Sequence, residues 1–222
     1  MTSPPGVVYK RHVKLLKNFL CCRNQRAVIC SARCVTSGRE LLGADRMNHG
    51  QFWDIVAKAC RPTATEREWA RNLIAELKCL SANEIVEWNH LFDELAFSAR
   101  TSDLWAAAYI INGGASDDGF YYFRCWLIGM GKDVYGAAVA DPDSLADVVT
   151  PPDPAGPQIY RMAETYAVAH QAWMAVTGRP DTDPYPARKE WSNMPVPGED
   201  WNYDNEAEVR RRLPRLASIF LK

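Results

Sequence analysis

Large apolar residues recur three and four positions apart along most of this 222-residue chain, which is the spacing of one face of an α-helix. Two of these stretches open with the Ser/Thr-x-x-Glu pattern of a capping box, at Thr63–Glu66 and at Ser81–Glu84. The helices that they open carry apolar stripes made of Trp69, Leu73, Leu77 and Leu80, and of Ile85, Trp88, Phe92, Leu95 and Ala99. This periodicity predicts an all-α fold.

The pattern continues and predicts about seven helices in a single globular domain. An apolar segment at 102–111 ends at Asn112-Gly-Gly114, because glycine tolerates the left-handed conformation that closes a helix. The run Phe120–Met130 holds one charged residue, so we expect a central helix there, with a buried strand as the alternative. The last clear stripe comprises Ile159, Met162, Tyr166, Ala169, Trp173 and Val176.

The C-terminal part has a different character. Residues 179–200 hold five prolines and no periodicity, so we expect a Pro-rich segment that wraps the surface with Trp191 and Trp201 as anchors. A final short helix is expected around Asn205–Arg212. Three arginines at its end follow two glutamates, so we expect salt bridges at the helix C-terminus and no nucleic-acid binding by these arginines.

Charge, cysteine and tryptophan content divide the chain near residue 46. Residues 1–46 hold nine Lys and Arg against two acids, a net charge of +7, whereas the rest of the chain has a net charge of −8. Four of the seven cysteines lie in this first segment, and all eight tryptophans follow it. We therefore predict a poorly ordered basic N-terminal arm at 1–46 and a helical domain at 47–222.

Three interpretations of residues 1–46 stay open. The segment can be an extension outside the working protein, which then starts at Met47. It also fits a targeting peptide, because it is rich in Arg and poor in acids. The third is a basic arm that binds nucleic acid, or a metal, although its cysteines lack the paired C-x-x-C spacing of a zinc ribbon.

The rest of the composition indicates a soluble protein. No run of eighteen apolar residues exists that could span a membrane. Cys60, Cys79 and Cys125 are an odd number and lie far apart, so we expect buried free thiols in a reducing cytoplasm. The overall net charge of −1 gives the chain no bulk attraction to nucleic acid.

The most specific stretch runs from Asp103 to Gly129 and reads DLWAAAYIINGGASDDGFYYFRCWLIG. Ser116 fits an N-cap, and the two aspartates that follow lie where the helix dipole favours negative charge. The same stretch can instead form a site for a polar ligand. The candidate ligand-binding residues are Asp103, Trp105, Asn112, Asp117, Asp118 and Arg124.

Arg124 is the one charge in the apolar run, and a buried guanidinium without a partner is costly. A structural salt bridge would satisfy it, with Asp117 seven residues earlier or with Asp103 from the preceding helix. The alternative is an arginine at the base of a pocket that binds a carboxylate or a phosphate.

The stretch from Asp103 to Gly129 resembles the signature of a bacterial family known as domain of unknown function 4240. The resemblance extends to Phe52-Trp53, Phe92-Asp93 and Leu213–Leu216, and so covers about residues 47–220. It implies a soluble bacterial protein, but no established activity that can be transferred to this chain.

The sequence lacks the H-E-x-x-H, G-x-S-x-G and Walker motifs. Glu87-x-x-His90 has the spacing of di-iron bundles but no second copy, so we predict no metal and leave the cofactor unknown. Our leading hypothesis is a cytoplasmic interaction or regulatory module, away from membranes, whose partner is a protein or a small polar ligand. Nucleic acid would bind only through residues 1–46.

The alternative hypothesis is an enzyme or enzyme subunit. It would bind a small polar or cationic ligand in a cleft around Asp103, Asp117, Asp118 and Arg124, with a carboxylate as general base.

Overall fold

The computed structural model describes residues 46–60, 65–151, 167–186 and 196–221. Within these ranges the chain forms nine α-helices, one 3₁₀ helix and no strand, which confirms the all-α class. The helices are α1 (His49–Ala59), α2 (Glu66–Leu77), α3 (Ala82–Ser98), α4 (Ser102–Asn112), α5 (Asp117–Gly129), α6 (Lys132–Ala140), the 3₁₀ helix η3 (Pro142–Asp147), α7 (Val168–Thr177), α8 (Glu206–Arg212) and α9 (Pro214–Phe220). Three predicted features lie outside the described residues, namely residues 1–45 of the basic arm predicted at 1–46, the first half of the last stripe, and Trp191.

Side-chain caps fix where the first three helices begin. The side chains of Asn48, Thr65 and Ser81 each accept a hydrogen bond from the backbone N–H of the residue three positions later. The side chain of that later residue in turn accepts a hydrogen bond from the backbone N–H of the cap. The capping box predicted at Ser81 is confirmed. The one predicted at Thr63 is wrong by two residues, because the pattern occurs twice in a row and the cap of α2 is Thr65, paired with Glu68.

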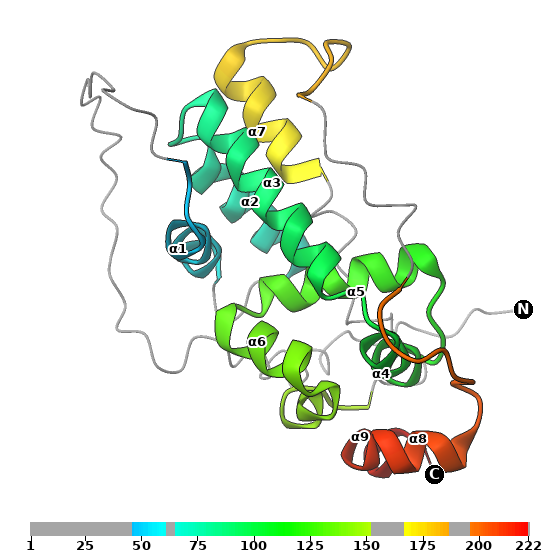
Figure 1. Ribbon diagram of the computed structural model, residues 1–222. Coiled ribbons are helices and arrows are strands. Elements are labelled where there is room, and N and C mark those ends of the chain that lie inside the picture. The colour runs from blue at the N-terminus through cyan, green and yellow to red at the C-terminus, as the bar shows by residue number, and fades with distance from the viewer. Residues whose placement is uncertain (1–45, 61–64, 152–166, 187–195, 222) are drawn as a thin grey trace, which may run out of the picture.

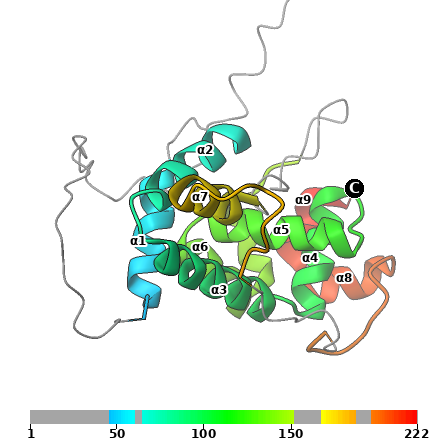
Figure 2. The same cartoon turned by 90° about the horizontal axis from the view of Figure 1, so that it is seen from above.

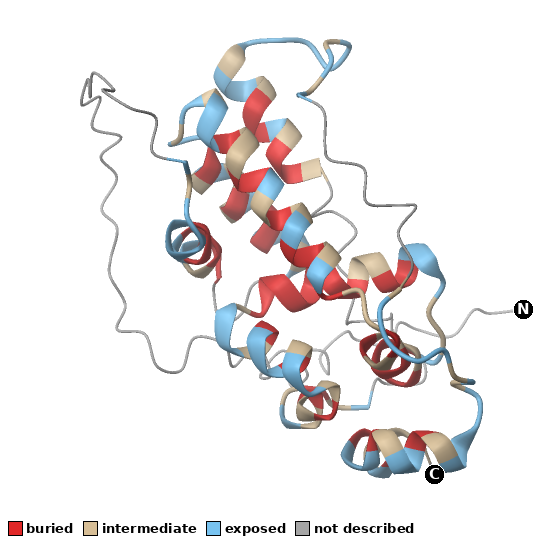
Figure 3. Ribbon diagram, in the orientation of Figure 1, coloured by how far each residue is buried: buried red, intermediate tan, exposed pale blue. Residues whose placement is uncertain are grey.

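Helix α5 runs through the middle of the molecule (Figure 1). Nine of its thirteen residues are buried, as Figure 3 shows by colour. This confirms the central helix predicted from the apolar run and excludes the strand alternative. Helices α1, α2, α3 and α7 lie on one side of α5, and α4, α6, α8 and α9 lie on the other (Figures 1 and 2).

Stacked aromatic rings join α1 to α3 inside the core. Phe52 stacks on Trp88 with ring centroids 5.1 Å apart, and Trp88 stacks on Phe92 at 5.3 Å. The whole predicted stripe of α3 is buried. The stripe of α7 ends one turn earlier than predicted, because Val176 is 39% exposed in the last turn before the Gly178 cap.

Two of the three later cysteines are buried as predicted, namely Cys60 and Cys125. The prediction is wrong for Cys79, which is exposed because α2 ends at Leu77 and Cys79 lies in the turn that follows.

The C-terminal part of the chain packs against α4. Helix α4 is buried on several sides, with Ala106, Ala107 and Ala108 all fully buried, and α5, α9 and η3 all contact it. The backbone N–H of Ser102 at its start donates to the carbonyl of Pro197 at 3.0 Å. The described end of the Pro-rich segment therefore lies on α4, as expected for a wrapping segment with Trp201 as an anchor.

The Gly-Gly turn between α4 and α5 depends on a left-handed residue. Gly113 has φ 66° and would place a Cβ in open space, so the cost of a side chain comes from the backbone alone. We expect Gly113→Ala to lower the free energy of unfolding by about 1–2 kcal/mol. Gly136, inside α6 and equally unobstructed, is the matched control, and Gly136→Ala should stabilise by about 0.5–1 kcal/mol. Denaturant unfolding of both variants measures this, and effects of the same sign would contradict it.

Candidate functional site

A cavity of about 460 Å³ lies among α3, α4 and the first half of α5. This size falls within the usual range of small-ligand pockets. Four charged side chains line it, which are Asp93, Arg100, Asp117 and Arg124. The rest of the lining is Ala96 and four aromatic side chains, Phe97, Trp105, Phe120 and Tyr121.

Arg124 lies at the base of this pocket and is only 7% exposed. Its Nη1 donates to the carbonyl oxygen of Ala96 at 2.5 Å, and its Nε donates to that of Phe120 at 3.3 Å. Its third nitrogen, Nη2, has no hydrogen-bond partner among the described residues and is not enclosed by protein. The guanidinium is thus fixed on two nitrogens and open on the third.

Arg124 also caps the C-terminus of α3, where Ala96 lies. The last turn of α3 tightens, because the Arg100 N–H bonds to Phe97 and not to Ala96. The Tyr135 hydroxyl donates to the neighbouring carbonyl of Leu95 at 2.7 Å, and burial raises the pKa of Tyr135 to about 12, which keeps the hydroxyl protonated. Arg124 thus satisfies the Ala96 carbonyl, which the helix end leaves open, while Tyr135 adds a second hydrogen bond to the Leu95 carbonyl, which also accepts the Ala99 N–H.

Aromatic rings hold the head of Arg124 in place. Its guanidinium carbon lies 4.6 Å from the centre of the Phe120 ring and 5.5 Å from that of Tyr121. Phe120 stacks on Trp105 with centroids 4.9 Å apart, and the indole N–H of Trp105 donates to the carbonyl of Ala115 at 3.1 Å. The turn between α4 and α5 therefore orients Trp105, which in turn supports the pocket wall.

The positive charge of Arg124 has no acidic partner among the described residues. The predicted salt bridge with Asp117 or Asp103 is wrong, because neither carboxylate reaches ion-pair distance of Arg124. Burial lowers the pKa of Arg124 to about 10, and the nearby charge of Arg100 lowers it further. The guanidinium remains charged at neutral pH, in surroundings that disfavour the charge.

Three of the six predicted site residues come together in the pocket, which are Trp105, Asp117 and Arg124. Asp118 is exposed in the first turn of α5 but does not line the cavity. Asn112 is buried, and its Nδ2 donates to the carbonyl of Ala108 within α4 at 3.1 Å.

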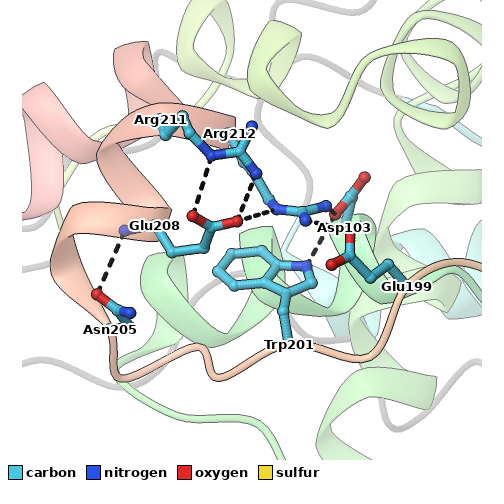
Figure 4. A network of polar contacts seen from close by, with 7 residues as sticks. All are labelled: Asp103, Glu199, Trp201, Asn205, Glu208, Arg211 and Arg212. Carbon is cyan, nitrogen blue, oxygen red and sulfur yellow. Dashed lines mark hydrogen bonds and ion pairs between the residues drawn. The ribbon is translucent and has the colours of Figure 1, made fainter.

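Asp103 belongs to a separate network that attaches the C-terminal part to α4 (Figure 4). Its Oδ1 accepts a hydrogen bond from Trp201 Nε1 at 2.9 Å and lies 3.5 Å from Arg212 Nη1. Arg212 also pairs with Glu199 and, through Nε at 2.7 Å, with Glu208. We call Asp103, Glu199, Trp201, Glu208 and Arg212 the C-terminal clasp.

The arginines of α8 are engaged in salt bridges, as predicted. Arg210 pairs with Glu206 at 3.5 Å, and Arg211 pairs with Glu208 at 2.5 Å. Hydrogen bonds from Arg211 and Arg212 lower the pKa of Glu208 to about 2. Arg210 and Arg211 therefore form ion pairs within α8, and Arg212 belongs to the C-terminal clasp.

Sequence reasoning missed the α3 side of the pocket. Asp93 and Arg100 line it from α3 and the residues just after that helix. Asp93 accepts a hydrogen bond from Asn89 Nδ2 at 2.9 Å. Helical spacing could not have indicated this pair, because α3 ends at Ser98 and Arg100 lies beyond it.

A family model described as protein of unknown function (DUF4240) matches residues 47–175, more than half of the chain. The chain belongs to the DUF4240 family. The DUF4240 match contains every residue of the pocket lining but ends before α8 and α9. The similarity expected at Leu213–Leu216 lies beyond it. Neither the curated proteins nor the solved structures gave a match.

The described part of this DUF4240 chain contains no group of three or more His, Cys, Asp or Glu side chains placed to hold a metal ion. Among the helices described, none combines the length and the apolar character that a membrane crossing requires.

Proposed function

We propose that this DUF4240 domain is a non-catalytic binding module whose pocket holds the anionic group of a small ligand on Arg124. The observation that carries the proposal is a guanidinium at the base of a cavity, without an acidic partner among the described residues and with Nη2 open. A bound carboxylate or phosphate would supply the missing negative charge.

The hydrogen-bonding capacity of Arg124 supports this assignment. A guanidinium has five N–H donors, of which two bond to carbonyl groups here, so three are left for a ligand. Its planar fork matches the two oxygens of a carboxylate or phosphate, and such charge-assisted bonds are about twice as strong as neutral ones. The α3 cap and the Phe120 ring hold this fork in place before a ligand arrives.

The described surface supports a small ligand over a protein partner. Val176 is the one exposed large hydrophobic residue among the described residues, so this part of the chain offers no broad apolar patch. Protein interfaces usually have an apolar core with aromatic anchors. Here the aromatic residues line a cavity and are at least half-buried.

Cys60 and Cys125 are buried and form no disulfide with a described residue, which supports a reducing compartment that we propose is the cytoplasm. The backbone N–H of Met47 donates to Glu87 on α3 at 2.5 Å, which supports a helical domain that begins at residue 47.

Thermal-shift measurements on the full chain test the binding proposal, with inorganic phosphate, aliphatic and aromatic carboxylates and free amino acids as probes. A ligand at 100 times its Kd stabilises by about 2.7 kcal/mol, a rise in Tm of about 5–10 °C for a chain of this size. We expect at least one probe to give this rise, and Arg124→Met to remove it.

The matched control is Arg71→Met, on the exposed face of α2, which should keep the full shift. A panel without any shift would overturn the proposal. A shift that persists in Arg124→Met would overturn it as well.

A further inference from the structure

The two charges of α5 that line the pocket lie on one side of the helix and do not meet. Asp117 and Arg124 are seven residues apart, so their Cα atoms are separated by about 10 Å along the axis. The Arg124 side chain runs back toward the N-terminus, since its Nε bonds to the Phe120 carbonyl and its head lies over the Phe120 ring. About one helical turn, roughly 5 Å, then separates the guanidinium from Asp117 along the axis.

A ligand that carries both charges can bridge this gap. Asp117 is exposed at the start of α5 and forms no ion pair with a described residue, so its carboxylate can receive a cation. Hydrogen bonds of about 2.9 Å at each end, with an anion and a cation about 3 Å apart between them, cover a span of up to about 9 Å. An ammonium group and a carboxylate attached to the same carbon atom have the shorter of these distances between their charges.

The overall charge of the pocket also favours a neutral ligand with separated charges. Its lining holds two aspartates and two arginines, so the formal charges cancel. A phosphate on Arg124 would lie close to Asp93 and Asp117, whose negative charges repel it. An ammonium group removes this conflict, because the same carboxylates then attract the ligand.

The aromatic lining defines what else the ligand carries. Four aromatic residues face a cavity of about 460 Å³, which is more space than two charged groups need. Rings at 4.5–7 Å prefer offset-stacked or edge-to-face contacts, and Phe120 and Trp105 already stack at 4.9 Å as part of one wall. A large apolar or aromatic side chain would fill the space beside them.

Building on the function proposed above, we infer that the ligand class is a free α-amino acid with a large apolar or aromatic side chain. Its carboxylate binds Arg124, its ammonium group binds Asp117, and its side chain lies against Trp105 and Phe120. Asp117 thereby takes a recognition role in the same pocket.

Calorimetric titration of the full chain with three related probes tests the inference. L-phenylalanine carries both charges, N-acetyl-L-phenylalanine lacks the cation, and L-phenylalanine amide lacks the anion. We expect L-phenylalanine to bind at least tenfold more tightly than either derivative. L-leucine and its N-acetyl form should repeat the pattern.

Two neighbouring aspartates provide matched variants in the same helical turn. Asp117→Asn should weaken L-phenylalanine binding about tenfold and leave N-acetyl-L-phenylalanine unchanged, whereas Asp118→Asn should change neither, because Asp118 does not line the pocket. Both side chains are exposed, so both variants should fold, which an unchanged Tm verifies.

The outcomes separate this inference from the function on which it rests. If N-acetyl-L-phenylalanine or inorganic phosphate binds as tightly as L-phenylalanine, and Arg124→Met removes that binding, the inference falls and the anion-binding function stands. Equal losses in Asp117→Asn and Asp118→Asn would also overturn the inference. Binding of these probes that survives Arg124→Met would overturn both.

Discussion

Asp143→Ala is expected to lower the Tm by about 6–12 °C, corresponding to about 3 kcal/mol, because it leaves two backbone donors without an acceptor. Asp143 is 6% exposed in η3, and its two carboxylate oxygens accept the backbone N–H groups of Arg215 and Leu216 at 3.0 and 2.9 Å. These groups lie in the first turn of α9, whose N–H groups have no partner within the helix. Each unsatisfied buried donor costs about 1–3 kcal/mol.

Asp147 in the same 3₁₀ helix is the matched control. It pairs with the side chain of Arg215, but both side chains are at least half exposed, so Asp147→Ala should cost less than about 1 kcal/mol. Thermal and denaturant unfolding of the two variants measures the difference. Equal losses would mean that the charge of η3 matters and not the hydrogen bonds of Asp143.

Asp143 illustrates what the sequence could not reveal. Its partners lie 72 and 73 residues further along the chain, and η3 approaches α9 only through tertiary packing around α4. By contrast, the Ser116 cap, the Gly113 turn and the stripe of α3 each depend on residues within a few helical turns. Those local features were predicted from the sequence and are confirmed by the structure.

The site residues divide in the same way. Asp117 and Arg124 share one side of α5, and their common position in the pocket follows from their spacing. The sequence-based prediction grouped Asp103 with these two residues only because it lies close to them along the chain. Because residues two apart on a helix do not face each other, Asp103 cannot share the side of α4 that carries Trp105, and it joins the C-terminal clasp.

The α3 side of the pocket needed the packed structure. Asp93 and Arg100 reach the cavity because α3 crosses α5, and the sequence does not determine which helices cross. The same crossing places the Ala96 carbonyl against Arg124. The crossing therefore explains why the guanidinium donates to a backbone carbonyl of α3 and does not form the predicted salt bridge.

Arg124→Glu is expected to lower the free energy of unfolding by about 3–5 kcal/mol, because it places a carboxylate in a buried position that holds a hydrogen-bond donor in the native protein. The new charge would face the Ala96 and Phe120 carbonyl oxygens, which repel it. It would also lie at the C-terminus of α3, where the helix dipole disfavours an anion.

Arg124→Met is the informative comparison and should change the stability by less than about 1.5 kcal/mol, because two effects offset each other. Burial lowers the pKa of Arg124 to about 10, well below that of an exposed arginine, so the charged form costs on the order of 3 kcal/mol. This cost is present at every pH below 10 and falls only as the pH rises through that value. Methionine removes it but also removes the cap on α3, a loss of about 1–3 kcal/mol.

Denaturant unfolding of the native protein, Arg124→Glu and Arg124→Met at neutral pH decides between a structural and a binding role for Arg124. If methionine is as harmful as glutamate, the guanidinium is needed for folding, and its retention requires no ligand. If methionine leaves the stability nearly unchanged while the thermal shift with ligand disappears, the fold does not need the buried charge. Its burial at the base of the cavity is then explained by the anion that it binds.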